Sequence, residues 1–160
     1  MIVAGIDPGA GGGLAVLSSS PGHPSAVLDV LPVPKAGEVV DEVAWASSWA
    51  SQLCFADEIW IERVGAMPGQ GVTSMFNFGK VYGFVIALAA ASGHPYSFVT
   101  PQVWRKTVGL PNGAAKGASR VRASQLFPAS ADQWKLARQD GLAEAALIAY
   151  HGALTLRGKE

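Results

Sequence analysis

The chain has 160 residues and a formal net charge of zero, with 49% hydrophobic and 15% charged residues. This composition excludes a disordered chain and favours one folded domain, which we assign to residues 1–160. The single Cys54 excludes an internal disulfide and a cysteine-based zinc site, and it is typical of a reducing cytoplasm. We expect neither a signal peptide nor a membrane span, because the longest apolar run, Val81 to Ala91, is shorter than the roughly 20 residues a span needs.

The first part of the chain predicts four strands and one helix. Ile2 to Asp7 and Gly13 to Leu17 are typical of two strands joined by a glycine-rich turn. Prolines close a third strand, Ala26 to Val33. Apolar residues at helical spacing follow from Glu38 to Leu53, and residues 57–63 (DEIWIER) predict a fourth strand.

The second part predicts three helices and one further strand. A long apolar helix, Thr73 to Ala91, ends at a Gly-His-Pro sequence, and residues 96–100 (YSFVT) form a fifth strand. A basic connection over residues 101–120 leads to a short helix that ends near residue 127, and the last helix covers Gln133 to Leu156. The order β-β-β-α-β-α-β-α-α predicts an α/β fold with a mixed five-stranded sheet and helices on both faces.

Four of the twelve acidic residues stand where a solvated surface does not explain them. Asp7 and Glu62 each end an apolar strand, at the edge of the sheet where ligand sites gather. Asp140 and Glu144 lie four residues apart, on one face of an otherwise apolar helix. Burying such charges costs several kcal/mol each unless something neutralises them.

Each acid also has a purely structural interpretation. Asp7 could cap the glycine-rich turn, Glu62 could pair with Arg63, and Asp140 could cap a helix with Glu144 in its first turn. The convergence of all four favours a pair of hard divalent cations, which prefer oxygen ligands. Two such ions about 4 Å apart can promote hydrolysis of a phosphodiester. We therefore predict a site for Mg²⁺, with Mn²⁺ able to substitute.

Three segments carry a resemblance to a known family. Residues 5–9 (GIDPG), the Glu that ends the fourth strand and residues 140–149 (DGLAEAALIA) resemble the RuvC family of Holliday-junction resolvases. Residues 114–128 (AAKGASRVRASQLFP) are similar to a basic segment of its short bacteriophage branch. The resemblance implies an RNase H-like fold, a homodimer, and Mg²⁺-dependent symmetric nicking of four-way DNA junctions by a two-metal mechanism. It also implies the cytoplasm of a bacterium or of a phage-infected cell.

The resemblance assigns roles to individual residues. It implies that Asp7, Glu62, Asp140 and Glu144 are the catalytic, metal-binding acids, and that Lys116 is a catalytic cation near the scissile phosphate. The chain departs from the cellular members in two ways. Their last acid is usually Asp, where this chain has Glu144, and their last two acids are three residues apart instead of four.

Residues 105–122 contain five basic residues and no acidic ones. This pattern predicts a phosphate-binding strip, with a solvated basic loop as the alternative. In cellular resolvases a residue directly after the strand-end acid stacks on unpaired bases. Met67, Phe76 or Phe78 could take that role here, although we expect both phenylalanines in the apolar core. The predicted DNA-binding residues are Arg105, Lys106, Lys116, Ser119, Arg120, Arg122, Met67 and Lys80.

The helix from Thr73 to Ala91 is more apolar than the covering of one sheet face requires. It is either a core helix or the seam of a two-fold dimer, which would place two active sites on two symmetric strands of a junction. His151 could approach the acids, although we expect it on the surface. The residues named for the seam are Met75, Phe78, Tyr82, Val85, Leu88 and Ala89.

Other functions remain open from the sequence. An RNA–DNA hybrid nuclease or a flap nuclease of the same fold would use the same acids, and a junction-binding protein without cleavage would not need them. Residues 5–13 (GIDPGAGGG) also resemble the phosphate loop of the sugar-kinase and actin superfamily. A chain of this length has no room for the second lobe of those proteins. We expect no membrane partner and no small-molecule cofactor.

Overall fold

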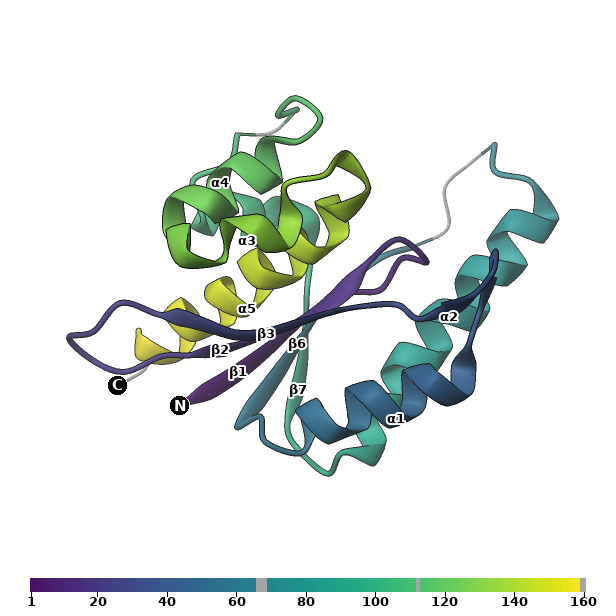
Figure 1. The fold of residues 1–160 in the computed structure, drawn as a ribbon, viewed down its shortest axis with the longest axis horizontal. Helices are drawn as coiled ribbons and strands as arrows, with labels where there is room; N and C mark the ends of the chain where they lie inside the picture. Colours follow the sequence, from purple (N-terminus) through teal and green to yellow (C-terminus); the bar gives the residue numbers. More distant parts are fainter. Residues whose placement is uncertain (66–68, 112, 159–160) are drawn as a thin grey trace.

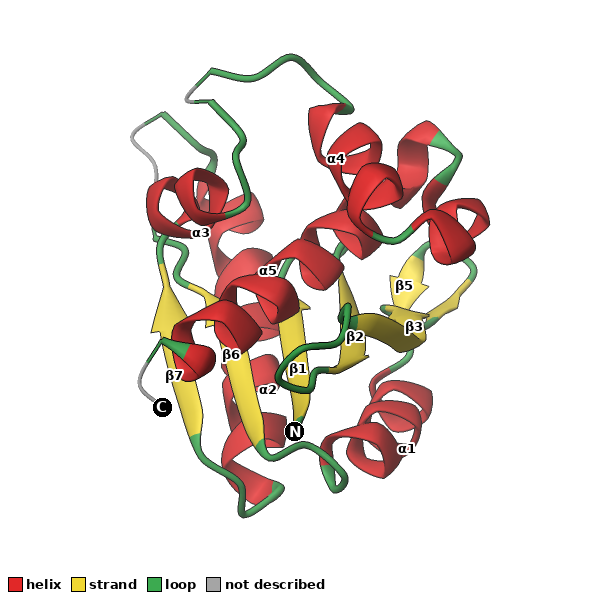
Figure 2. Cartoon of the chain, turned by 90° about the vertical axis from the view of Figure 1, so that its left-hand side faces the viewer, coloured by secondary structure: helices red, strands yellow, loops and turns green. Residues whose placement is uncertain are grey.

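A mixed five-stranded sheet forms the centre of the molecule (Figures 1 and 2). The computed structural model describes residues 1–65, 69–111 and 113–158. The strand order is β3-β2-β1-β6-β7; β1 pairs antiparallel with β2 and parallel with β6. The predicted fold class is confirmed. The five strands are β1 (Ile2–Asp7), β2 (Gly13–Ser18), β3 (Ala26–Pro32), β6 (Glu58–Glu62) and β7 (Tyr96–Val99).

One face of the sheet is covered by α3 (Pro101–Thr107), α4 (Ala118–Leu126) and α5 (Asp140–Arg157) (Figure 1). The helix α5 lies directly on β1. A Cβ atom on Gly5 would collide with the backbone of Ala149, so only glycine permits this approach. Small residues on the helix complete the contact, which brings the start of α5 close to the end of β1.

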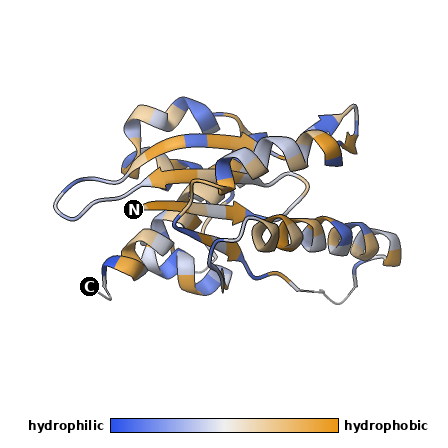
Figure 3. Ribbon diagram, turned by 90° about the horizontal axis from the view of Figure 1, so that it is seen from below, coloured by the Kyte–Doolittle hydropathy of each residue, from blue (hydrophilic) through white to orange (hydrophobic). Residues whose placement is uncertain are grey.

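The opposite face is covered by α1 (Glu42–Leu53) and α2 (Val72–Ala91) (Figure 2). Trp45 and Trp49 of α1 are fully buried here against the aliphatic side chains of β1 and β2. The strands are among the most hydrophobic parts of the chain, as their colouring in Figure 3 shows. Burial of these aliphatic and aromatic side chains is the main source of stability on this face.

The helix α2 presents one side to this core and leaves the other side uncovered. Val85 and Ala89 are buried, and Tyr82 and Leu88 pack partly against the core, so much of the predicted dimer seam faces inward. The exposed side instead carries Phe76, which is 68% exposed. Within the described ranges, α2 is the one helix long and apolar enough to cross a membrane, by length and composition only.

Three predicted elements differ from the observed ones. The helix predicted from Glu38 begins at Glu42, because residues 39–40 form a short strand, β5, that pairs with β4 (Lys35–Ala36). The basic connection contains α3, which begins at Pro101, a favoured first residue of a helix. The helix predicted from Gln133 begins at Asp140, because residues 128–134 and 137–139 form 3-10 helices.

Candidate active site

Two of the four acids lie at the same edge of the sheet. The strands β1 and β6 are parallel, and Ile6 lies opposite Ile61. Asp7 and Glu62 therefore follow at neighbouring strand ends, as predicted. Glu62 lies opposite Val99 of β7, so the chain that enters α3 starts beside it. Glu62 is only 8% exposed, which is rare for a carboxylate without a functional or structural partner.

The helix α5 brings Asp140 and Glu144 to this edge. The residue between them, Gly141, sits against the turn between β1 and β2. A Cβ atom here would lie 2.8 Å from Oδ2 of Asp7 and closer still to the turn backbone. Glycine thus allows the first turn of α5 to contact Asp7 directly, and the structure gathers the four predicted acids at one end of the sheet.

Burial and repulsion between the acids change the ionisation of Asp7. The pKa of Asp7 is raised from 3.8 to about 7, chiefly by loss of hydration and to a smaller extent by the charges of Glu144 and Glu62. The backbone N–H of Gly9 donates to Asp7 Oδ1 at 3.2 Å and opposes this rise, as does the charge of Arg105. A carboxyl group that resists ionisation at neutral pH is one on which a cation would be strongly stabilising.

Glu62 is perturbed in the same direction. Burial raises its pKa, and a hydrogen bond from the indole N–H of Trp104 to Oε1, 2.8 Å long, opposes the rise. The charge of Glu144 adds a smaller increase. Asp7, Glu62 and Glu144 therefore form one electrostatically coupled group, the acid trio.

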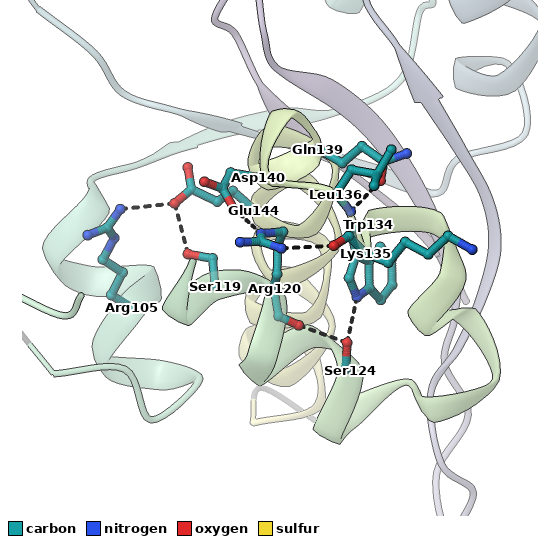
Figure 4. A network of polar contacts seen from close by, with 10 residues as sticks. All are labelled: Arg105, Ser119, Arg120, Ser124, Trp134, Lys135, Leu136, Gln139, Asp140 and Glu144. Carbon is teal, nitrogen blue, oxygen red and sulfur yellow. Dashed lines mark hydrogen bonds and ion pairs between the residues drawn. The ribbon is translucent and has the colours of Figure 1, made fainter. Parts of the chain in front are cut away.

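Side chains of α3 and α4 bind the two acids of α5 (Figure 4). Oε1 of Glu144 accepts from Arg105 Nη2 at 3.0 Å and from Ser119 Oγ at 2.8 Å. Asp140 pairs with Arg120 Nε, and the same guanidinium donates to the carbonyl of Lys135 at 3.0 Å. Arg105, Ser119 and Arg120 were predicted as DNA-binding residues, and the structure places all three on the acids.

The donor set fits a hard divalent cation, although the side chains do not form a finished coordination site. Within residues 1–65, 69–111 and 113–158, no three acidic, histidine or cysteine side chains lie close enough to hold one ion as they stand. The acid trio offers only oxygen ligands, carries mutually repelling charges and is partly desolvated. These are the properties that Mg²⁺ or Mn²⁺ would offset.

A pocket of about 220 Å³ opens beside the acids. Its lining combines Asp140 and Glu144 with Arg105, Ser119 and the exposed Lys116. Lys116 lies in the loop before α4, and Gly117 starts that helix with a positive φ of 83°. The pocket therefore places two cationic side chains, Arg105 and Lys116, and two carboxyl groups on one small concave surface.

The other predicted DNA-binding residues lie outside this pocket. Lys106 is exposed on α3 and lines a separate, shallow groove with Gln102 and Gly109. Arg122 donates to the carbonyl of Val108 at 2.6 Å, which ties α4 to the end of α3. Lys80 is exposed on α2, and Met67 lies outside the described residues.

Three side chains differ from the sequence-based expectation. Phe76 is exposed, so its predicted place in the core is wrong, whereas Phe78 is partly buried and stacks on Tyr82. His151 is 5% exposed, not on the surface, and lies 3.0 Å from Thr107 Oγ1; burial lowers its pKa. Trp104, which contacts Glu62, was not recognised from the sequence, because an isolated tryptophan gives no signal of its partner.

Comparison with known proteins supports the fold. No protein-family model matches the chain, and no curated protein matches it. Among solved structures, Thermus thermophilus RuvC is similar with a TM-score of 0.69 and 20% identity, over 99% of this chain and 97% of the other. The chain has the RuvC fold.

Two further structures agree with this result. T. thermophilus RuvC in complex with a Holliday junction substrate gives a TM-score of 0.70 at 19% identity, covering 99% of this chain and 96% of the other. The yeast mitochondrial Holliday junction resolvase Ydc2 gives 0.53 at 14% identity, covering 96% and 80%. The likeness extends over nearly the whole chain, so the five-stranded sheet and the helices on both of its faces belong to the shared fold.

Proposed function

We propose that the chain is a crossover junction endodeoxyribonuclease, which resolves four-way DNA junctions by metal-dependent symmetric nicking. The observation that carries this proposal is the acid trio beside a pocket lined by Lys116, Arg105 and Ser119. The RuvC-like fold supports it, since one neighbour of that fold is in complex with a Holliday junction substrate. We place the activity in residues 1–160 and in the cytoplasm of a bacterium or phage-infected cell.

The acids would hold the divalent cations. Asp7, Glu62 and Glu144 are the primary ligands in this proposal, and Asp140 completes the set. When bound, a pair of Mg²⁺ ions would activate the attacking water and stabilise the leaving oxygen of the phosphodiester. Lys116 would offset charge that develops on the scissile phosphate, because it lines the pocket and none of the ion pairs among the described residues involves it.

The arginines would contact the DNA backbone. Arg105 and Arg120 are about one quarter to one third exposed, at 32% and 25% of their side chains, so phosphates can reach them. Each now pairs with an acid of α5. A phosphate that binds the guanidinium would release the acid toward a cation, so the DNA and metal would bind cooperatively. Ser119 would be freed from Glu144 in the same way.

The exposed side of α2 would form the seam of a homodimer. Gly79, Gly83 and Ala87 recur every four residues on this side, and all three are exposed. A Cβ atom on either glycine would meet nothing within 4 Å, so packing inside the chain does not require glycine there. Small residues at this spacing allow two helices to approach closely. A two-fold dimer would present two active sites to two strands of a junction.

The direct test is cleavage of a labelled four-way junction by the purified chain. Linear duplex, a flapped duplex and an RNA–DNA hybrid are run beside it, each with Mg²⁺, with Mn²⁺ and with EDTA. We expect cleavage of the junction alone, with either metal, and none with EDTA.

Three variants accompany that panel. Asp7→Asn and Glu62→Gln should bind the junction and fail to cut it, while Asp132→Asn, which changes a highly exposed acid, should cut normally. Preferential cleavage of the hybrid or the flap would move the chain to another nuclease of this fold. Tight junction binding with no cleavage in either metal would leave a binding protein and contradict the enzyme.

A further inference from the structure

Trp104 makes an unusual contact for a core tryptophan. Its side chain is fully buried on α3, and its indole N–H donates to Oε1 of Glu62 at 2.8 Å in a buried hydrogen bond. Within the described ranges, no other donor binds the side-chain carboxyl group of Glu62. The bond therefore joins one acid of the trio to the hydrophobic core.

The fold explains how Trp104 reaches this acid. Glu62 ends β6 opposite Val99, the last residue of β7, and the N–H of Arg63 donates to the carbonyl of Val99 at 2.7 Å. Thr100 and Pro101 then start α3 immediately, so one turn of helix places the indole of Trp104 over the end of β6. The position of the donor is thus fixed by the sheet register and by the first turn of α3.

An indole N–H suits the task of fixing a metal-binding carboxylate. It is a donor only, so it cannot take up the proton of the acid or compete for a cation. Its ring is held on one side by the guanidinium of Arg105, which lies 5.2 Å from the ring centre. The bond occupies Oε1 and leaves Oε2 of Glu62 without a described donor. Groups that orient metal-binding carboxylates commonly affect metal affinity as much as 10–100-fold.

We infer that Trp104 is a positioning residue, whose indole N–H holds the Glu62 carboxylate in the orientation needed to bind a divalent cation. This inference rests on the proposed function, because that function assigns Glu62 to the metal. Trp104 touches neither substrate nor cation in this account and acts only through Glu62.

The test compares two buried tryptophans. Trp104→Phe removes the N–H bond to Glu62, while Trp49→Phe removes a longer indole bond, from Trp49 Nε1 to the carbonyl of Pro32 at 3.4 Å, on the opposite face of the sheet. Both side chains are 0% exposed. Affinity for Mn²⁺ is measured by calorimetry without DNA, and the melting temperature is measured in EDTA.

We expect Trp104→Phe to weaken Mn²⁺ binding about 10–100-fold. Both substitutions should lower the melting temperature in EDTA, and Trp49→Phe should leave Mn²⁺ affinity within about twofold of wild type. In a Glu62→Gln background, Trp104→Phe should cause no further loss of Mn²⁺ affinity, because the acid that it positions is already gone.

A second variant covers the case in which Trp104→Phe does not fold. Benzothienylalanine at position 104 keeps the shape of the indole and replaces the N–H by sulfur, and it should weaken Mn²⁺ binding in the same range. Wild-type affinity in this variant or in a folded Trp104→Phe protein would overturn the inference, as would an equal loss in Trp49→Phe.

The result that would contradict the proposed function differs from the one that would contradict the role of Trp104. A wild-type chain that binds Mn²⁺ and never cuts a junction would contradict the resolvase and leave Trp104 as the positioning residue of a metal site. A wild-type chain that binds no Mn²⁺ would overturn both proposals.

Discussion

The two faces of the sheet bury tryptophans in similar numbers and use them differently. On the α1 and α2 face, Trp45 and Trp49 pack edge to face with ring centres 5.1 Å apart. Trp49 donates to a backbone carbonyl, and the indole N–H of Trp45 has no partner among the described residues. On the α3 to α5 face, Trp104 donates to Glu62 and so reaches the acid trio.

This difference separates stability from function. Among the described residues, the buried side chains of the α1 and α2 face are apolar, so their contacts contribute mainly to the free energy of unfolding. The α3 to α5 face also carries the desolvated acids at its edge, and their mutual repulsion opposes folding. Substitutions at Asp7 or Glu62 should therefore raise stability while they remove activity, and substitutions in the opposite core should lower stability alone.

The largest expected effect is that of Asp7→Asn. Loss of this acid should lower the rate of junction cleavage at least about 10²–10³-fold, the size seen when one preorganised electrostatic contact is removed. The same variant should be more stable than wild type near pH 8 in EDTA. Ionisation of a group whose pKa has risen from 3.8 to about 7 destabilises the folded state by about 4 kcal/mol, and asparagine avoids this cost.

The pH dependence of this gain has a definite sign. Between about pH 4 and pH 7 the folded state binds the proton on Asp7 and the unfolded state does not, so wild-type stability falls as the pH rises through this range. The advantage of Asp7→Asn should accordingly be small near pH 4 and complete above pH 7, as measured by thermal melting. A constant difference at all pH values would contradict the buried, repelled state of Asp7.

The sequence carried enough information to predict this acid and not enough to predict its surroundings. Asp7 and Glu62 could be found because a carboxylate at the end of an apolar strand is anomalous in itself, and parallel pairing of the two strands then brings them together. Gly141 gave no comparable signal. Glycine is needed at position 141 because the helix lies so close to the turn between β1 and β2, and only the tertiary structure defines that distance.

The same limit applies to the helices. The start of α3 carried a recognisable sequence, Thr100 followed by Pro101, but the basic and glycine-rich residues after it favoured a loop. The pairing of Arg105 with Glu144 links residues 39 positions apart, and local pattern does not define contacts of that range. The basic residues could be predicted as a group near the acids; their individual partners could not.

The second largest expected effect is a loss of stability from a substitution in the core of the α1 and α2 face. Leu53→Ala should lower the free energy of unfolding by about 2–5 kcal/mol, because Leu53 is fully buried at the end of α1. At a temperature where the variant is still folded, its affinity for Mn²⁺ and for a four-way junction should equal that of wild type. Denaturant unfolding and calorimetry measure the two quantities. A loss of Mn²⁺ affinity in folded Leu53→Ala would break the separation between the faces.

The smallest expected effect on stability is that of Arg120→Gln. Its ion pair with Asp140 is partly exposed, so removal should change the free energy of unfolding by no more than about 1 kcal/mol. Junction binding should weaken, and the slope of log affinity against log salt should fall by about one. Lys135→Gln is the control, since Lys135 is exposed and pairs with Asp132. Equal salt slopes for wild type and Arg120→Gln would place Arg120 outside the DNA interface.

The most direct test of the central claim is the fate of a supercoiled plasmid that extrudes a cruciform, incubated with the chain and Mg²⁺. Two matched nicks within the lifetime of one complex convert the plasmid to a linear molecule, whereas one nick gives an open circle. We predict a linear product whose ends map to symmetric positions on opposing strands, with no product from Asp7→Asn. Open circles alone, or an uncut plasmid that the chain binds tightly, would contradict a dimeric junction resolvase.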